Sequence, residues 1–352
     1  MDFELSEDRR MLRESLSRWL ADRYPPDHRL KVAYDAPFHD PALWSELADL
    51  GVLLAMATED AGGFGGSGFD ISVIFEALGA ALCPEPVLGA LLVSRLLAAA
   101  GQDQSGLLDG SVRWALAVGE PDAPWSLDRI ATQARGGRLT GRKALVYGGN
   151  DADRFLVVAR DGDRLSVHEI AASDAEVVGF GTIDGGGAAD VILSDTPARL
   201  VLDDAGKAIQ SALDAGRLAL CAEAVGVMDA SFAALLDYLR QRKQFGRAIG
   251  EFQALQHRAA DLAVEIEQAR SITLLAASRL DGEGAARMVS MAKNLIGRVG
   301  RQVAEECTQM TGGIGVTWDY HPAHLTKRLV MIDHQLGDTD WHLQQVMAGI
   351  RA

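Results

Sequence analysis

The chain has 352 residues, of which 48% are hydrophobic, and a formal net charge of −15 from 34 Lys and Arg against 49 Asp and Glu. This length exceeds that of one compact domain, and the apolar content suffices for a large core. The acidic balance argues against a nucleic-acid partner, because nucleic acid requires a basic face. An anionic cofactor stays compatible with this charge, since a few local Arg and Lys side chains can bind phosphate.

The cysteines, the first residues and the apolar runs indicate in which cellular compartment the protein is expected. Cys83, Cys221 and Cys307 are odd in number and widely spaced, which gives neither a metal-binding spacing nor a disulfide framework. The first residues are acidic and lack the layout of a signal peptide. We expect no apolar run that approaches the ~20 residues of a membrane span. We therefore expect a cytoplasmic protein with buried thiols, no metal and no membrane span.

The first 110 residues predict a helical domain. Ser6 can cap a first helix, and two consecutive prolines end it at Pro25 and Pro26. We expect further helices after residue 41, around residues 74–82 and over residues 91–99, with a glycine-rich loop at residues 59–66.

Between residues 111 and 202, strand-like runs replace the helical pattern, and Gly and Asp fill the gaps. We expect strands at residues 114–118, 130–134, 143–147, 155–159, 165–170 and 191–194. Such a run of short strands predicts a small β-barrel or sandwich.

From residue 203 to the end, the sequence predicts an antiparallel helical bundle. Three long helices are expected over residues 208–240, 254–280 and 285–310, with faces rich in Ala and Leu. The fold class is therefore α+β multidomain. Its expected domains are 1–110 (helical), 111–202 (β) and 203–352 (helical bundle).

A corner between the first two long helices carries the most distinctive chemistry. Gly246 and Gly250 break the helical pattern, and Arg242 and Phe245 stand beside them. A guanidinium is a planar fork for phosphate oxygens, so the corner predicts a phosphate-bearing ligand close to the backbone. For a lone arginine and phenylalanine, a solvated Arg and a core Phe would be the simpler interpretation.

The corner resembles a signature of the acyl-CoA dehydrogenase family. The family pattern Arg-x-x-Phe-Gly-x-x-Ile-x-x-Phe-Gln stands here from Arg242 to Gln253. A Glu-x-x-Gly-Gly-x-Gly loop at residues 59–65 and a Gln-x-x-Gly-Gly-x-Gly segment at residues 309–315 follow the family in the same order. The resemblance covers nearly the whole chain. It implies α,β-dehydrogenation of an acyl-CoA thioester, in fatty-acid or steroid side-chain β-oxidation, with electron-transfer flavoprotein as the electron acceptor.

The resemblance implies FAD as the cofactor, and part of its site lies across a subunit interface in this family. The residues that it assigns to the cofactor are Arg242, Gln244, Phe245, Gln309, Gly312 and Gly313. No Gly-x-Gly-x-x-Gly follows a strand, so a nicotinamide site of the Rossmann type is not expected.

Two β segments resemble the wall that holds a chain's own flavin ring, and both depart from the family. Gly119 stands where the family has a threonine that donates to the ring. Leu145 replaces a tryptophan, and Tyr147 replaces a threonine. Tyr147 could supply a ring from another position, and an ordinary apolar strand is an equally good interpretation of these segments.

The usual catalytic base is absent. In most members, a glutamate before Gly-Thr near the C-terminus takes the α-proton, and here that position is Leu336. In a minority, the glutamate precedes the arginine that opens the long helix, and here that position is Gly216. Neither leucine nor glycine can accept a proton. Asp338 is the candidate replacement, with a solvated or capping role as the alternative, and Arg217 is expected to contact the substrate.

Two functions from different classes stay open at this point. The chain is either an active FAD-dependent dehydrogenase with an unusual base, or a non-catalytic structural subunit that completes a partner's FAD site in a mixed tetramer. Use of oxygen as the acceptor, as in acyl-CoA oxidases, is a third possibility without a sequence marker. A homo- or hetero-tetramer with a homologous chain is expected in each case.

Overall fold

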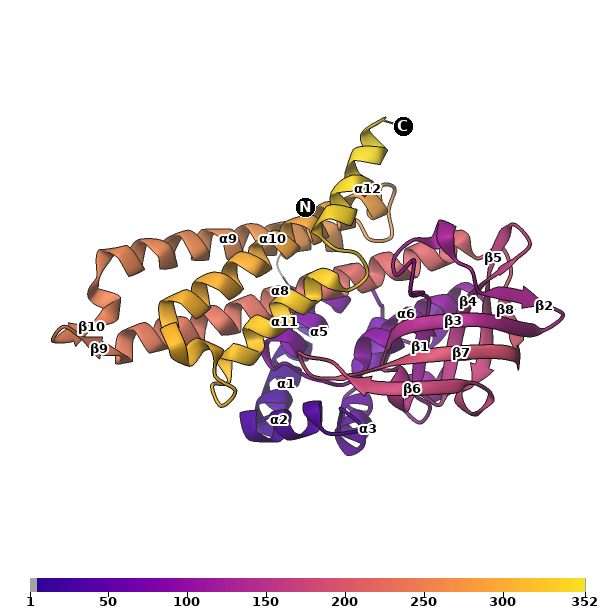
Figure 1. Cartoon of the computed structure of the whole chain (residues 1–352), viewed down its shortest axis with the longest axis horizontal. Helices are drawn as coiled ribbons and strands as arrows, with labels where there is room; N and C mark the ends of the chain where they lie inside the picture. The colour runs from indigo at the N-terminus through magenta and orange to yellow at the C-terminus, as the bar shows by residue number, and fades with distance from the viewer. Residues whose placement is uncertain (1–4, 352) are drawn as a thin grey trace. The chain divides into compact units, whose positions relative to one another are not determined.

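The computed structural model describes residues 5–351, and Figure 1 shows its helices and strands along the chain. Helices come first, strands follow, and helices return, so the expected fold class is confirmed. The chain divides into two compact units. One comprises Met1–Pro26, Ile71–Cys83 and Arg217–Ala352, and the other comprises Asp27–Asp70 and Pro84–Gly216. The three domain boundaries expected from the sequence stay a prediction.

The N-terminal part is helical as expected. Its elements are α1 (Glu7–Arg23), α2 (Pro26–Tyr34), α3 (Pro41–Asp49), α4 (Val52–Met56), η1 (Glu59–Ala61), α5 (Gly68–Ala80), α6 (Val87–Ala99) and α7 (Ser105–Leu108). The side chain of Ser6 caps α1 by accepting from the backbone N–H of Arg9, and Asp40 caps α3 in the same way. Local capping chemistry therefore sets where these helices begin.

The strands form one eight-stranded mixed sheet. They are β1 (Trp114–Ala117), β2 (Gln133–Arg135), β3 (Arg138–Tyr147), β4 (Arg154–Asp161), β5 (Arg164–Ala171), β6 (Glu176–Gly181), β7 (Gly187–Pro197) and β8 (Arg199–Leu202). The order is β6-β7-β3-β2-β4-β5-β8, and β1 pairs with β4 in parallel. Short 3-10 turns lie between strands at Leu127–Arg129, Gly149–Asp151 and Ala172–Asp174. Phe155, Val157 and Ile170 lie in the hydrophobic core of this sheet.

A buried histidine ties two segments of the sheet-containing unit together. The Nδ1 atom of His39 lies 3.1 Å from a Glu85 oxygen, and its Nε2 atom lies 2.9 Å from an Asp151 oxygen. Asp151 also pairs with Arg113 at 3.2 Å. Burial alone would lower the pKa of His39, but the hydrogen bonds and charges of Glu85 and then Asp151 outweigh it and raise that pKa.

This arrangement predicts a pH-dependent contribution to stability. The raised pKa means that the folded state holds the proton more tightly than the unfolded state. The stabilisation is therefore complete below the ordinary histidine pKa of about 6.5, and it is lost as pH rises through the raised value. We expect His39→Gln to destabilise the protein by about 1.5–3 kcal/mol at pH 6 and by clearly less at high pH. Denaturation midpoints of both proteins from pH 6 to 9 test this, and a gap that does not change with pH would contradict it.

The C-terminal part is a bundle of long helices, as expected. Its elements are α8 (Gly206–Gln241), β9 (Lys243–Gln244), β10 (Arg247–Ala248), η5 (Ile249–Glu251), α9 (Gln253–Ala277), α10 (Ala285–Thr311), η6 (Gly312–Val316), α11 (Pro322–His334) and α12 (Thr339–Arg351). In Figure 1, α9, α10 and α11 run alongside the long helix α8, and the β9–β10 hairpin projects at one end. This arrangement places both family segments, residues 242–253 and 309–315, at helix ends.

The helix α8 corrects one expectation from the sequence. It is long and apolar enough to cross a membrane by length and composition, although no such run was expected. However, 72% of its most apolar window is buried inside the protein. Burial of this kind is typical of the central helix of a packed bundle.

Two glycines allow α5 and α8 to cross with their backbones in contact. A Cβ atom at Gly226 would lie 1.9 Å from the carbonyl oxygen of Glu76, and one at Gly79 would lie 2.1 Å from that of Glu223. No side chain fits at either place, so the crossing requires glycine on both helices.

Candidate functional site

The corner predicted from the sequence is a tight hairpin after α8. In this hairpin, Gln244 pairs with Arg247 across β9 and β10, and the N–H of Ile249 donates to the carbonyl of Arg242 at 2.8 Å. Phe245 occupies the turn with a left-handed φ of 54°, which is unfavourable for a residue with a Cβ atom. The turn therefore holds Phe245 outward, and its side chain is 91% exposed.

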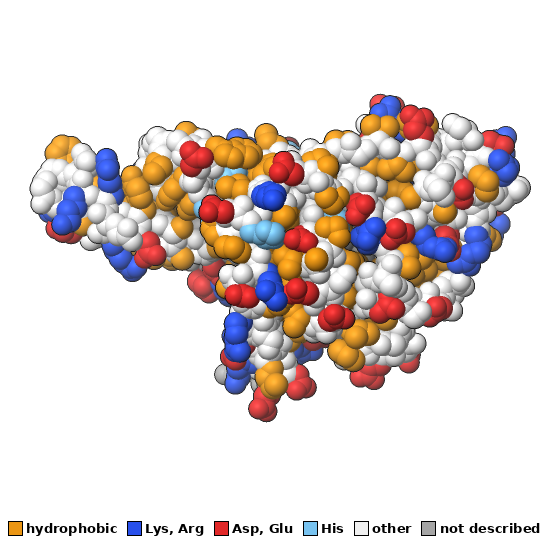
Figure 2. Space-filling model, turned by 90° about the horizontal axis from the view of Figure 1, so that it is seen from below, with side chains coloured by type: hydrophobic (Ala, Val, Ile, Leu, Met, Phe, Trp, Pro, Cys, Tyr) orange, Lys and Arg blue, Asp and Glu red, His pale blue; other side chains and the backbone are white. Residues whose placement is uncertain are grey.

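The side chains of this hairpin are open to contact from outside. Arg242 and Gln244 are exposed. Arg270 in the same bundle, by contrast, bonds Glu76 at 2.8 Å and Asp229 at 2.5 Å. Among residues 5–351, no carboxylate oxygen lies within ion-pair distance of the Arg242 guanidinium. Figure 2 shows acidic, basic and apolar side chains interspersed over the face that it draws.

The second family segment lies at the end of α10. Gln309, Gly312 and Gly313 are all exposed there. Tyr238 near the end of α8 and Tyr320 just after η6 meet edge to face, with ring centroids 6.5 Å apart. This contact places the end of α10 at the same end of the bundle as the hairpin.

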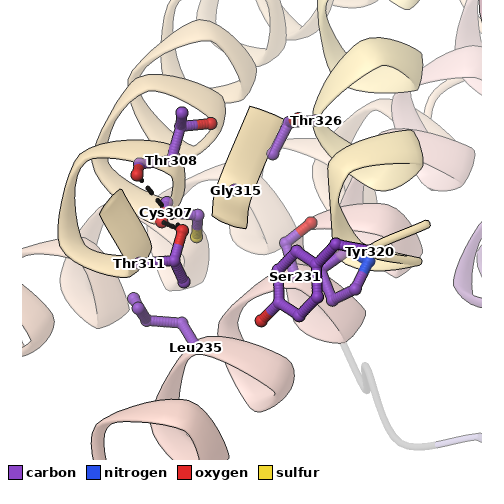
Figure 3. A pocket seen from close by; sticks show the side chains of 9 residues that line it. Ser231, Leu235, Cys307, Thr308, Thr311, Gly315, Tyr320 and Thr326 are labelled. Carbon is purple, nitrogen blue, oxygen red and sulfur yellow. Dashed lines mark hydrogen bonds between the residues drawn. The ribbon is translucent and has the colours of Figure 1, made fainter. Parts of the chain in front are cut away.

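A small pocket lies beneath the η6 turn. It has a volume of about 10 Å³ and is lined by Ser231, Leu235, Cys307, Thr308, Thr311, Gly315, Tyr320, Pro322 and Thr326. Figure 3 shows the hydroxyl groups around it, with Thr311 donating to the carbonyls of Cys307 and Thr308. The volume falls below the ~300–1,000 Å³ of usual ligand pockets, so a ligand would meet η6 on its outer surface instead.

In the sheet-containing unit, a buried ion pair supports the first of the two predicted flavin segments. The ammonium of Lys143 is fully buried and donates to Glu120 at 2.7 Å and to the carbonyl of Val118 at 3.2 Å. The Glu120 carboxylate also accepts from the backbone N–H groups of Ala131 and Thr132. Burial lowers the pKa of Lys143 to about 8, and Glu120 opposes that shift. This pair fixes the backbone on both sides of Gly119.

The two replaced positions in these segments lie side by side. The N–H of Ala144 donates to the carbonyl of Gly119 at 3.0 Å. A Cβ atom at Gly119 would lie 3.2–3.3 Å from two backbone carbonyl oxygens, so a threonine would be crowded there. Leu145 is 42% exposed with a left-handed φ of 53°, while Tyr147 ends β3 and is half-buried. The two segments therefore lack the threonine hydroxyl at position 119 and the indole ring at position 145.

The loop that would carry the base connects α11 to α12. Its residue Leu336 has a left-handed φ of 56°, and the Nε atom of Arg217 donates to its carbonyl at 3.0 Å. Arg217 is only 2% exposed, and its guanidinium stacks over the ring of Trp341 at 4.8 Å. Arg217 thus holds the loop backbone. Its expected contact with a substrate stays a prediction.

Asp338 has a structural partner in this loop. Its Oδ1 atom accepts from the backbone N–H of Trp341 at 2.8 Å, which caps the start of α12. The carboxylate is thus engaged in the capping role that the sequence offered as the alternative. Its role as the catalytic base stays a prediction.

Comparison with known proteins identifies the fold and its motifs. The acyl-CoA dehydrogenase N-terminal domain family matches residues 6–105, and the acyl-CoA dehydrogenase C-terminal domain family matches residues 204–350. The acyl-CoA dehydrogenase IpdE2 of Mycobacterium tuberculosis is 30% identical over 326 residues, which cover 91% of this chain and 89% of that protein. The chain belongs to the acyl-CoA dehydrogenase family.

Two solved structures with the acyl-CoA dehydrogenase fold each name two proteins in their descriptions, and one of the two is described as a complex. The Tcur3481–Tcur3483 steroid acyl-CoA dehydrogenase (G363A variant) has a TM-score of 0.89 and 28% identity, with 98% of each chain covered. The ChsE4–ChsE5 complex from Mycobacterium tuberculosis has a TM-score of 0.90 and 25% identity, covering 100% of this chain and 99% of that one. The family assignment made from the motifs is therefore confirmed over nearly the whole chain.

The structure also reveals residues of this acyl-CoA dehydrogenase chain that sequence reasoning missed. Lys293 is fully buried and donates to the carbonyls of Ile332, Asp333 and Gly337 at 2.7, 3.1 and 3.1 Å. Its only signal in the sequence is a charge within the apolar stripe of α10. Burial lowers the pKa of Lys293 to about 8.

Next to this lysine, His342 is completely buried, and its Nδ1 atom lies 3.2 Å from the Ser290 hydroxyl. Burial, with Arg217 and Lys293 nearby, lowers the pKa of His342 to about 2, so its imidazole is neutral.

Proposed function

We propose that this acyl-CoA dehydrogenase-family chain completes the FAD site of a homologous partner in a mixed tetramer. FAD accepts the hydride from the substrate β-carbon when it is bound in such a site. The observation that carries the proposal is the set of residues at one end of the bundle: Arg242, Gln244, Phe245, Gln309, Gly312 and Gly313 are all exposed. Arg242 and Gln309 would hold the pyrophosphate and the adenosine half, and acyl-CoA and electron-transfer flavoprotein would be the other partners, in the cytoplasm.

The glycines of η6 support a ligand from outside. Gly315 is needed within the chain, because a Cβ atom there would lie 2.3 Å from the Thr311 hydroxyl, and Gly312 has a φ of 72°. Gly313 has neither reason: a Cβ atom there meets nothing within 4 Å, and its φ is not positive. Glycine reduces the stability of ordered backbone, so we infer that something beyond this chain approaches Gly313 closely.

Two departures favour the partner-dependent function over an independent enzyme. The segments for a chain's own flavin ring lack the usual hydroxyl and indole at Gly119 and Leu145. The usual base positions hold Gly216 and Leu336, which carry no proton acceptor. One similar structure is described as the ChsE4–ChsE5 complex, and another names the pair Tcur3481–Tcur3483, which supports a mixed assembly for this chain. The active enzyme stays the second candidate, with Asp338 as its base and Tyr147 against its flavin.

Substitution of Arg242 tests the cofactor contact. Loss of a charge-assisted, bidentate contact with phosphate should weaken FAD binding by the assembly with its homologous partner by about 1.5–3 kcal/mol, or roughly ten- to a hundredfold. Arg242→Ala should leave the helical circular dichroism unchanged, because the side chain is exposed. FAD dissociation constants measured by fluorescence provide the comparison, and mass spectrometry of the released cofactor distinguishes FAD from FMN.

Arg240→Ala is the matched control, since Arg240 is an exposed arginine two residues away that pairs with Asp237. We expect the control to bind FAD normally. Gly313→Ala should also weaken FAD binding while leaving the stability of the lone chain unchanged or slightly raised. An unchanged dissociation constant in both Arg242→Ala and Gly313→Ala would overturn the proposed site, and so would recovery of FMN.

A further inference from the structure

The turn between α11 and α12 (residues 335–338) is held by basic side chains from three different helices. Arg217 of α8 donates to the carbonyl of Leu336, and Lys293 of α10 donates to the carbonyl of Gly337. Arg328 of α11 donates to the side-chain oxygen of Gln335 at 3.0 Å. Three consecutive residues, Gln335, Leu336 and Gly337, are therefore each fixed by a different helix. The turn nevertheless lacks the glutamate that serves as the base in most members of the family.

Arg328 differs from Arg217 and Lys293 because a carboxylate fixes the orientation of its guanidinium. Its Nε and one terminal nitrogen donate to the two oxygens of Glu223 on α8, at 2.6 and 2.7 Å. Both side chains are nearly buried, with exposures of 14% and 11%. A bidentate Arg–carboxylate pair fixes the plane of the guanidinium, so the second N–H of the terminal nitrogen that bonds Glu223 points in one direction. That direction is Gln335, whose side chain is 5% exposed.

The backbone of the turn requires such support. Leu336 is in the left-handed region at φ 56°, which an L-residue with a side chain disfavours. Such a conformation persists only where the surrounding contacts over-determine it. Gly337 follows at φ 113° and packs against Trp341 and His342, where a Cβ atom would lie 2.7 Å from each ring. The turn is thus a fixed platform that sets where the side chain of residue 336 points.

We propose that Glu223 and Arg328 form a positioning pair that acts through Gln335 to fix the turn and, with it, the side chain at position 336. The inference rests on the proposed function, in which Leu336 stands in the place of the family's carboxylate. The chain then lacks the base at position 336 but has contacts that would position one there. A carboxylate introduced at position 336 would be held in place by contacts that already exist.

The first test measures the turn directly and needs no activity. Hydrogen–deuterium exchange of peptides spanning residues 332–342 is followed in the assembled protein with natural Leu336. Arg328→Met should raise exchange of these amides about tenfold or more, because Gln335 loses its donor. Gln335→Leu removes the same contact without leaving Glu223 unpaired, so it should have a similar local effect even if Arg328→Met folds poorly.

The control variants separate position from charge. Arg328→Lys keeps the charge without the planar fork, so it should restore protection only partly. Arg258→Met removes a comparable bond, to Glu306 at 2.7 Å, elsewhere in the bundle and should leave the turn unchanged. Normal protection of the turn in both Arg328→Met and Gln335→Leu would overturn the proposal.

The second test asks whether the pair positions a working base. In the lone chain supplied with FAD, Leu336→Glu should make acyl-CoA bleach the visible flavin absorbance faster than in the natural lone chain. Adding Gln335→Leu or Arg328→Met should slow that bleaching about 10- to 100-fold at an unchanged acyl-CoA dissociation constant, since a misplaced base affects the rate rather than binding. Leu336→Glu that does not accelerate bleaching, with FAD bound and the turn protected, overturns the proposal.

These outcomes are distinguishable from a failure of the proposed function. FAD retention depends on Arg242 and Gly313, and neither residue touches the turn. Normal FAD loading with no effect of the turn variants rejects the positioning pair alone. If Arg242→Ala binds FAD normally and bleaching is slower in Leu336→Glu/Gln335→Leu than in Leu336→Glu, the shared FAD site alone is rejected.

Discussion

Purified alone and supplied with FAD, the chain should dehydrogenate acyl-CoA about 10²–10⁴ times more slowly than an enzyme of this family with its base in place. Removal of the α-proton requires a carboxylate within hydrogen-bonding reach of that proton. The two family positions hold Gly216 and Leu336, and neither side chain can accept a proton. Stopped-flow absorbance of the flavin, with acyl-CoAs of several chain lengths, measures the rate.

Two additions to this experiment separate the alternatives. Adding a homologous partner chain should produce rapid bleaching if the reaction belongs to the partner's site. If the lone chain bleaches rapidly, a base exists within it, and Asp338→Asn then tests the capping aspartate. Slow bleaching by the natural chain and no change in Asp338→Asn would agree with the role of Asp338 as the cap of α12. Oxygen consumption under the same conditions tests the oxidase alternative.

Gly226→Ala should destabilise the protein by about 3 kcal/mol or more, at or above the upper end of the usual range for overpacking. The new Cβ atom would lie 1.9 Å from the carbonyl oxygen of Glu76 and 3.0 Å from the backbone nitrogen of Ala80. These are backbone atoms of α5, so no rotamer change can relieve the clash. The helices α5 and α8 would have to separate, which would open gaps along the whole crossing.

Gly349→Ala is the matched control for this substitution. Gly349 lies in α12, and a Cβ atom there meets nothing within 4 Å. Alanine favours a helix over glycine by about 1 kcal/mol, so the control should be neutral or slightly stabilising. Denaturation midpoints of the three proteins are compared under identical conditions. A midpoint for Gly226→Ala close to that of the natural protein would show that the crossing is not as tight as described.

Sequence alone determined the features that depend on local chemistry. The starts of α1 and α3 follow from Ser6 and Asp40, because a capping side chain bonds backbone N–H groups only two or three residues away. The three long helices follow from apolar residues at three- and four-residue steps. The corner at Arg242 likewise follows from residue type and spacing, and the missing base at Leu336 follows from the resemblance to the family; neither needs knowledge of the fold.

Only the tertiary structure decided which polar groups are buried and what they hold. Lys293 lies 39–44 residues from the carbonyls that it bonds, and Glu223 lies 105 residues from Arg328. No local pattern links such pairs, because they form only when separate helices pack together. The burial of α8 is decided in the same way, since its sequence also satisfies the length and hydropathy of a membrane span.

The glycines show the same division most clearly. Gly313 and Gly315 belong to one motif, and the sequence treats them alike. In the folded chain, Gly315 packs against Thr311, while Gly313 faces open space. Packing within the chain requires glycine at position 315, whereas nothing in the described part of the chain requires it at position 313. That difference depends on which atoms surround each Cα, and only the three-dimensional packing of α10, η6 and their neighbours determines those surroundings.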